Sequence, residues 1–295
     1  MSYRLKRKEK VAAGICRVAR GQMNRARRGH TDRSLNGGDP VHQTRKSIKK
    51  LRALLRLIRS GVPSRFFKSE HASWRNMGRL LAPLRDAHVL VRTISHLQRA
   101  AGPKAATQFA AAKKWLRHDE NRSRSAGNAT LARVEILIEK SQDRVARWPL
   151  KNLAWRHAAA GLAGSYGAAR HAFRKASRKN GDTGALHEWR KRTKEFHYHL
   201  RLLCNFRPSL MKKLARKAGR LAKLLGDDHD RGVLSTVLEM KTGLDSSGIR
   251  TLISRERRRL RKRAVLLGEK LFAEKPKHFE QRIRDYAKTP RRRRS

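Results

Sequence analysis

Two segments of the sequence carry basic side chains one helical turn apart, a spacing suited to contacting a row of phosphate groups. On a helix, which turns about 100° per residue, each segment separates an apolar stripe from a basic row. The first row is His42, Arg45, Lys49, Arg52 and Arg56, with Lys46 beside it. The second row is His187, Arg190, Lys194, His197 and Arg201, with Lys191 beside it.

The arginine and lysine side chains of these rows suit phosphate oxygens. Arginine offers paired donors to two oxygens, lysine offers a mobile point charge, and neither needs the edge of a base. Successive cations lie about 5.4 Å apart along a helix axis, which is comparable to the repeat of an extended phosphate polymer. For one such helix, a solvated basic face is the alternative. We favour phosphate contact because the same row occurs twice.

His42 and His187 occupy corresponding places in the first turn of the two segments. Either histidine alone would more often cap a helix or pack than bind a ligand. Their recurrence within the rows favours phosphate contact. A neighbouring polyanion favours the imidazolium form, so we expect this contact to strengthen as the pH falls towards about 6.5.

The two segments belong to a longer internal repeat. They align without a gap, so that the histidine, an Arg-Lys pair, a lysine and a Leu-Arg-Leu run coincide. Upstream, residues 13–15 match 160–162, and downstream, residues 85–90 match 229–234. Three matching blocks in the same order predict duplication of a helical half, and therefore two pseudo-symmetric helical bundles.

The net charge of the chain limits the kinds of molecule that it is expected to bind. The chain has 74 Lys and Arg against 23 Asp and Glu in 295 residues, a formal charge of +51. Such an excess repels itself and indicates a polyanionic partner: nucleic acid, polyphosphate or an anionic membrane. Hydrophobic residues make up 38% of the chain and recur along it, which indicates a packed core. Cys16 and Cys204 are too few for a disulfide framework or a zinc site, and we expect reduced thiols.

The elements that would position the rows are helices. Apolar residues recur at three- and four-residue spacing between Gly, Pro or Asn breaks, and period-two strand patterns are absent, so we predict an all-α fold. The predicted helices span about 8–29, 40–59, 64–81, 86–100, 105–125, 128–147, 151–179, 184–205, 208–225, 229–241, 247–272 and 276–288. Residues 290–295, which include Arg291 to Arg294, are expected to form a disordered basic tail.

Four motifs resemble the CHAD domains, a family named for a histidine-bearing α-helical domain. They are Val-His-x-x-Arg-Lys-x-x-Lys-Lys-Leu-Arg-x-x-Leu-Arg at 41–56, Leu-Arg-Asp-x-x-Val-Leu at 84–90, Leu-His-x-x-Arg-Lys at 186–191 and Leu-Leu-Gly-x-x-His-Asp-x-x-Val-Leu at 224–234. The resemblance implies two related bundles around a basic central cavity that binds inorganic polyphosphate, and often association with polyphosphate granules. Thr193, Glu195 and His197 stand where the family more often carries apolar or basic residues.

The resemblance covers nearly the whole chain, so we expect one domain over 1–289, with halves 1–148 and 149–289. No stretch approaches the roughly 18 apolar residues of a membrane span, and the N-terminus runs into charge without an apolar region. We therefore expect no membrane insertion and a cytoplasmic location, with polyphosphate granules as a candidate place within the cell.

Two dipeptides invite catalytic interpretations. His187-Glu188 begins like a zinc-protease helix, but Lys191 stands where the second histidine ligand should be. His229-Asp230 is similar to a dipeptide of metal-dependent phosphohydrolases.

The phosphohydrolase interpretation is weakened by the repeat. The block that matches His229-Asp230 has Arg85-Asp86, so the position tolerates a non-ligand, and we interpret the aspartate as helix-start chemistry. A row of spaced glutamates for triphosphate hydrolysis is also missing from the sequence. We expect a non-catalytic protein with no metal and no cofactor.

Nucleic acid is the second candidate partner, because the charge would serve DNA or RNA equally well without regard to sequence. Exposed aromatics for stacking bases are not evident, since Trp74, Trp115, Trp155 and Trp189 lie at apolar helix positions and are predicted core residues. A membrane surface ranks third, because the basic helices lack a large apolar face. The sequence leaves open the oligomeric state, the preferred polymer length and whether the polymer lies in a pore or a groove.

Overall fold

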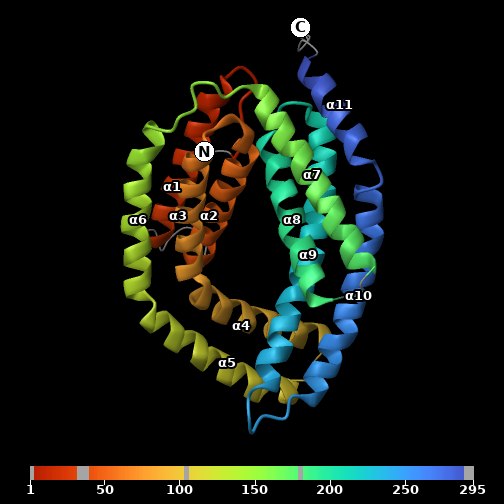
Figure 1. The fold of residues 1–295 in the computed structure, drawn as a ribbon. Coiled ribbons are helices and arrows are strands. Elements are labelled where there is room, and N and C mark those ends of the chain that lie inside the picture. The colour runs from red at the N-terminus through yellow and green to blue at the C-terminus, as the bar shows by residue number, and fades with distance from the viewer. Residues whose placement is uncertain (1–2, 32–39, 103–105, 179–181, 289–295) are drawn as a thin grey trace.

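A computed structural model describes residues 3–31, 40–102, 106–178 and 182–288. Within these ranges the chain is helical and has no strand, as the sequence predicts (Figure 1). The α-helices are α1 (Val11–Thr31), α2 (Pro40–Leu57), α3 (Ser64–Leu80), α4 (Ala82–Ala101), α5 (Ala106–Ala126), α6 (Asn128–Ala146), α7 (Trp155–Arg178), α8 (Thr183–Leu202), α9 (Pro208–Glu239), α10 (Ser247–Leu271) and α11 (Pro276–Lys288); one 3₁₀ helix, η1, covers Arg59–Gly61. The predicted tail, 290–295, lies outside the described residues.

Helix α9 runs through a point where the sequence predicts a break. The predicted helices 208–225 and 229–241 form one helix, so their separation was wrong. Gly226 is buried in its middle, and a Cβ there would lie 4.0 Å from Arg190 Nε on α8. A helical glycine costs about 1 kcal/mol relative to alanine. Packing against α8 offsets that cost, so the helix continues.

The helices of the two halves pair in the same order. In the first half α1 packs on α2 and α6, α2 packs on α3, and α4 packs on α5. In the second half α7 packs on α8 and α11, α8 packs on α9, and α9 packs on α10. The long helix α9 thus takes the place of α3 and α4 together. Duplication as the origin of this likeness stays a prediction.

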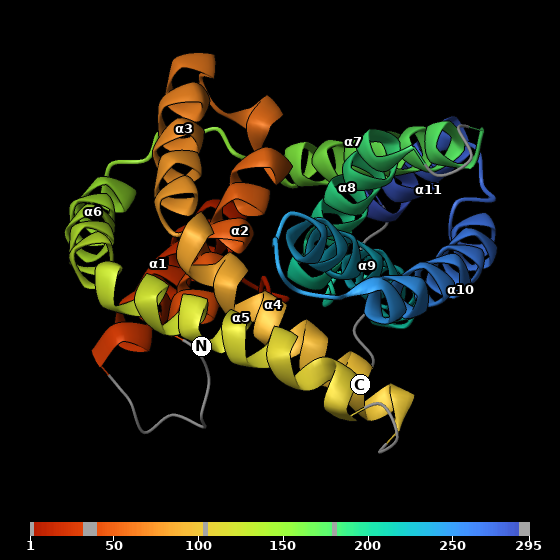
Figure 2. The same ribbon diagram turned by 90° about the horizontal axis from the view of Figure 1, so that it is seen from below.

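The halves contact each other in two regions. In the first, α2 packs on α7 and α8, and η1 packs on α7. In the second, α4 and α5 contact α9 and α10 through a separate apolar cluster that includes Ile94, Phe109, Leu234 and Ile253. Figure 2 shows α1–α6 on one side and α7–α11 on the other, with α4 and α5 reaching across to the second half. The relative position of α2 and α8 is therefore fixed from two ends.

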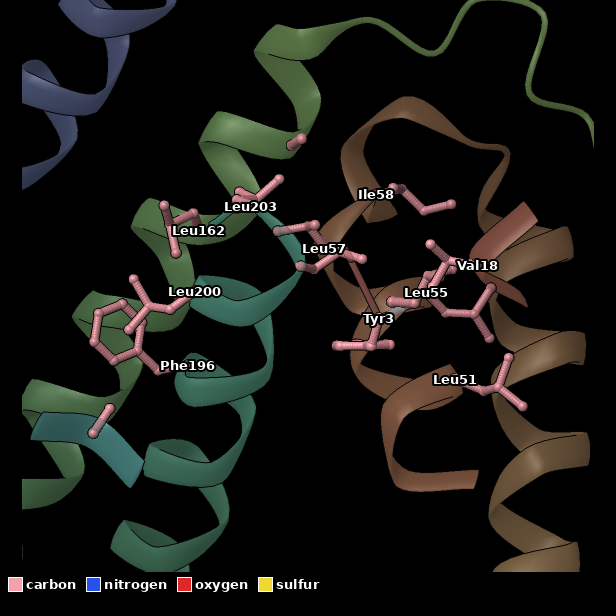
Figure 3. Packing of buried hydrophobic residues seen from close by; sticks show 14 of the residues in the cluster. Tyr3, Val18, Leu51, Leu55, Leu57, Ile58, Leu162, Phe196, Leu200 and Leu203 are labelled. Carbon is pink, nitrogen blue, oxygen red and sulfur yellow. The ribbon is translucent and has the colours of Figure 1, made fainter. Parts of the chain in front are cut away.

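The main core is continuous across the first contact region. Leu57 at the end of α2 is buried, as are Leu162 on α7 and Leu200 and Leu203 at the end of α8 (Figure 3). A Cβ at Gly161 would lie 2.0 Å from the carbonyl oxygen of Leu57. Only glycine allows α7 to pass the end of α2 at this distance, so the sequence provides for the close contact of the halves.

The segment before α1 bridges the two halves. The hydroxyl of Tyr3 donates to the carbonyl oxygen of Lys50 on α2 at 3.0 Å. The backbone N–H of Leu5 donates to the carbonyl oxygen of Leu202 on α8 at 2.8 Å. Asn205 Nδ2 then donates to the carbonyl oxygen of Leu5 at 2.9 Å. Hydrogen bonds of this short segment thus connect α2, at Lys50, with the C-terminal end of α8, at Leu202.

Candidate polyanion-binding site

The two basic rows lie on either side of one cavity of about 190 Å³ between α2 and α8. Its lining residues are Lys49, Arg52, Ala53 and Arg56 from α2, and Arg190, Lys191, Arg192, Lys194, Glu195 and Tyr198 from α8. The sequence predicts the rows separately, on helices far apart along the chain. The structure brings members of both rows around a single space.

Positive charge dominates the cavity lining. Glu195 is the one acidic residue among the lining residues that the structure describes. Its Oε2 lies 3.1 Å from Arg56 Nη1 on α2 and 3.8 Å from Arg192 Nη1 on its own helix. The Arg56–Glu195 pair also joins the two halves. Glu188, outside the lining, lies 2.7 Å from both Lys191 Nζ and Arg192 Nε. The lining cations Lys49, Arg52 and Lys194 have no carboxylate at ion-pair distance among the described residues.

A loose group of charges lies behind the α8 side of the cavity. Asp230 Oδ1 on α9 lies 3.8 Å from Arg85 Nη2 on α4 and 3.9 Å from Arg190 Nη2 on α8. These distances are too long for hydrogen bonds, and among the described residues Asp230 Oδ1 and Arg190 Nε are buried without a hydrogen-bond partner. Buried polar atoms normally have partners, so this group is suited to rearrangement around an incoming ligand.

Asp230 has a different role from the one that the sequence suggests. It lies in the interior of α9 and not at a helix start, so the interpretation as helix-start chemistry was wrong. The error has the same origin as the predicted break in α9. The downstream repeat block does contain Arg85 and Asp230, so the sequence carried a signal for both residues, but it gave no reason to place them beside Arg190.

The first row keeps most of its predicted face. Lys49, Arg52 and Arg56 line the cavity, and Arg52 Nε lies 3.4 Å from His71 Nε2 on α3. Arg45 is partly buried and donates from Nη1 to the carbonyl oxygen of Gly78 at 2.8 Å. Neither Arg45 nor the two other predicted members of this region, His42 and Lys46, lines the cavity; His42 is partly buried and Lys46 is exposed.

Beyond Lys194, the residues of the second row do not line the cavity. His197 turns to α9, where its Nδ1 lies 3.0 Å from the carbonyl oxygen of Ala215. Arg201 is exposed beyond the cavity. Of the predicted second row, Arg190 and Lys194 therefore reach the cavity, as does the flanking Lys191.

His187 lies at a second, smaller space. Its ring centroid is 5.3 Å from that of His229 on α9. Both histidines line a cavity of about 180 Å³ between α8, α9 and α10, together with Asp228 and Arg257. Asp228 accepts from Arg257 Nε at 3.1 Å, so its charge is already matched. The structure separates His187 from the cavity that Lys49 and Lys194 line.

Comparison with known protein families gives a match over most of the chain. The model of the family described as the CHAD domain matches residues 19–239, a range that includes both basic rows. This chain belongs to the CHAD domain family. The resemblance inferred from the four motifs is confirmed. No curated protein matches the sequence.

Two solved structures share the fold of this CHAD domain. The crystal structure of the CHAD domain from the plant Ricinus communis is similar with a TM-score of 0.60 and 14% sequence identity, covering 96% of this chain and 95% of that chain. PptA from Streptomyces chartreusis is similar with a TM-score of 0.57 and 13% identity, covering 90% of this chain and 100% of that chain. At such identities the likeness extends to the fold alone.

Burial among cations lowers the pKa of basic groups in this CHAD domain. Burial, followed by the charge of Lys194, lowers the pKa of Lys49 to about 6. Burial, followed by the charge of Arg190, lowers the pKa of Lys194 to about 8. Burial also lowers the pKa of Arg52 to about 10, with Arg56 as the second cause. This cluster of cations therefore resists holding its full positive charge.

The histidines of the CHAD domain are shifted in the same direction. Burial and the neighbouring Arg190 lower the pKa of His187. Burial lowers the pKa of His197 to about 4 despite its hydrogen bond to Ala215. In the ligand-free protein these rings are therefore neutral at pH 7, and a protonated imidazole would require a nearby anion to raise its pKa.

The described helices also bear on a metal centre and on membrane insertion. Within the described ranges, no three histidine, cysteine, aspartate or glutamate side chains gather in a way that could hold a metal ion. In the same part of the chain, none of the helices combines the length and apolar character needed to cross a membrane.

Proposed function

We propose that this CHAD domain binds inorganic polyphosphate in the cavity between α2 and α8. The observation that carries the proposal is the meeting of two cationic rows, from opposite halves, around one space with a single acidic lining residue among those described. Guanidinium and ammonium groups held close together match closely spaced phosphates, and no element of the cavity would select a base.

The size of the cavity favours a thin linear polymer over a duplex. A space of about 190 Å³ can receive a chain one phosphate group wide, whereas a nucleic-acid duplex could contact only the rim. The formal charge of +51 would still attract DNA or RNA to the outer surface. Nucleic-acid binding is therefore expected to be weaker and to depend on other residues.

The proposed role is binding without turnover. We propose that the protein carries out no hydrolysis of polyphosphate or nucleotides and requires no metal or cofactor. A protein that only binds a long polymer would locate where the polymer accumulates, so a cytoplasmic location at polyphosphate granules is part of the proposal.

A competition experiment tests the proposed function. Labelled long-chain polyphosphate is bound at physiological salt and displaced by unlabelled polyphosphate, duplex DNA or single-stranded RNA, with concentrations expressed as phosphate units. We expect polyphosphate to compete at concentrations at least about tenfold lower than either nucleic acid. Equal midpoints, or release of orthophosphate by the purified protein without added metal or with Mg²⁺, would contradict the proposal.

A further inference from the structure

Two lysines from opposite halves occupy the centre of the cavity. Lys49 on α2 and Lys194 on α8 are both partly buried and both line the space. Neither has a hydrogen bond or an ion pair to any residue that the structure describes. The charged groups that act on them, or that line the cavity beside them, are Arg45, Arg52 and Arg56 on α2, Arg85 on α4, Arg190, Lys191, Arg192 and Glu195 on α8, and Asp227 and Asp230 on α9.

The carboxylates in this group favour one lysine over the other. Asp230 and Asp227 act to raise the pKa of Lys194, but no carboxylate appears among the groups that act on Lys49. Glu195 is held by Arg56 and Arg192. An ammonium group at Lys49 would thus lose part of its hydration, and the largest charge effects on it are repulsions from neighbouring cations, which disfavours its charged form.

The pKa values of the two lysines agree with this geometry. The pKa of Lys49 is lowered to about 6, so its amine is largely neutral at pH 7 and above. The pKa of Lys194 is lowered to about 8, so its amine is mostly charged at pH 7. A polyanion in the cavity would supply the missing negative charge and return both groups towards their usual protonated state.

We infer that polyanion binding in this cavity is coupled to proton uptake by Lys49 and, to a smaller extent, by Lys194. The inference rests on the proposed function and specifies how the site is regulated: the empty cavity holds fewer positive charges than the occupied one. Binding generates part of the positive charge that holds the polymer.

The sign of the pH dependence follows from this coupling. A group whose pKa rises on binding takes up a proton, so affinity falls as the pH rises through the interval between the free and the bound pKa values. For Lys49 that interval begins at about pH 6. Within it, each group that takes up a proton on binding makes the affinity fall by up to about tenfold for every unit by which the pH rises. Below it, Lys49 is already charged and adds no further pH dependence.

Other titrating groups can be separated from the lysines by the choice of pH and ligand. The pKa values of His71 and His229 are lowered to about 4, and that of His187 is lowered too. These rings are therefore neutral at pH 8, and they would take up a proton there only if binding raised their pKa well above the ordinary histidine value of about 6.5. The terminal phosphates of the polymer ionise with a pKa of about 6 and are few in a long chain. Uptake measured at pH 8 with long-chain polyphosphate therefore reports on lysine.

Isothermal titration calorimetry at pH 8 tests the inference. Long-chain polyphosphate is titrated into the full chain in two buffers that differ in heat of ionisation, and the difference in binding heat gives the protons taken up. We expect at least about one proton per occupied cavity for the unsubstituted protein, most of it taken up by Lys49 and the rest by Lys194. Lys49→Arg cannot lose its charge near pH 8 and should lose most of the uptake. Lys140→Arg on α6, exposed and outside the cavity, is the matched control and should keep it.

The calorimetry distinguishes failure of the proton-uptake inference from failure of the proposed function. Binding heats that are equal in both buffers for the unsubstituted protein would overturn the inference, as would proton uptake by the Lys49→Arg protein as large as that of the unsubstituted protein. Absence of binding in every buffer would instead refute the proposed function on which the inference rests. Lys49→Met, which is similar in size and uncharged, provides a second test if the arginine disturbs the fold: it too should lose the uptake.

Discussion

The basic rows on α2 and α8 have the same spacing in the sequence but different surroundings in the fold. Repeat mates, meaning residues at the same place in the two aligned segments, end up on different surfaces. Arg52 and Arg56 line the cavity, whereas their mates His197 and Arg201 contact α9 or lie exposed. Lys49 and its mate Lys194 both reach the cavity.

The difference shows that the packing partner of a helix determines what a basic row can do. On the α2 side, neighbouring helices supply a carbonyl group for Arg45 and the ring of His71 for Arg52. On the α8 side, α9 supplies Asp230 next to Arg190 and a carbonyl group for His197. Coulomb interactions are strong where water is excluded, so the carboxylate of Asp230 changes the electrostatic potential at the neighbouring basic side chains of the α8 row.

Removing the pair Arg52 and Arg56 is expected to have the largest effect on polyphosphate binding. Replacing both with alanine removes two charged contacts and should weaken binding on the order of 100-fold. Replacing the repeat mates His197 and Arg201 with alanine should weaken it less than about threefold, since neither lines the cavity. Fluorescence anisotropy at physiological salt measures both.

A charge-matched control accompanies this comparison. Lys212 and Lys213 are exposed on α9, and alanine at both also removes two positive charges. Circular dichroism of every variant establishes that the fold is kept. Equal losses for the cavity pair and its mates would mean that the two rows are equivalent, contrary to the structure.

Neutralising Asp230 is expected to have an intermediate effect in the opposite direction. Asp230→Asn removes the negative charge beside Arg85 and Arg190, so polyphosphate should bind about tenfold more tightly at moderate salt. Asp86→Asn, at its repeat mate, should change binding less because the Asp86 side chain is 53% exposed against 13% for Asp230. Titrations at several salt concentrations give both effects. Weaker binding by Asp230→Asn would indicate that the carboxylate positions the arginines instead of opposing the ligand.

Deleting residues 290–295 is expected to have the smallest effect. The tail belongs to neither basic row, and interactions between exposed charges are screened over about 8 Å at physiological salt, so the loss should be less than about twofold. The truncated and full chains are compared by the same anisotropy assay. A loss as large as that of the Arg52 and Arg56 variant would mean that net charge governs binding, and the cavity proposal would have to be abandoned.

The sequence predicted the helices well because their apolar periodicity is strong and the breaks between them are marked. It failed at Gly226, where a glycine that usually weakens a helix is buried in the middle of α9, which packs along α8. Local patterns report the cost of such a residue in an isolated helix. They do not report the tertiary contact that offsets it.

The candidate site was predictable only in part for a related reason. The rows on α2 and α8 could be recognised because residues on one helix face recur with a fixed period. The turn of His197 towards Ala215 and the approach of Asp230 to Arg190 depend on how α9 packs, which no local pattern contains. The repeat predicted equal halves, whereas the cavity is built from unequal contributions.

The hydrogen bonds of Tyr3 and Leu5 have a practical consequence for where this chain can be cut. A fragment trimmed to the matched range, 19–239, would lack these residues together with α10 and α11. It would expose Leu234 on α9, which clusters with Ile253 of α10, and it would lose the hydrogen bonds of the first residues to Lys50 and Leu202. The cooperative folding unit is therefore wider than the stretch by which the family is recognised, and expression or domain-transplantation work should retain at least residues 3–288.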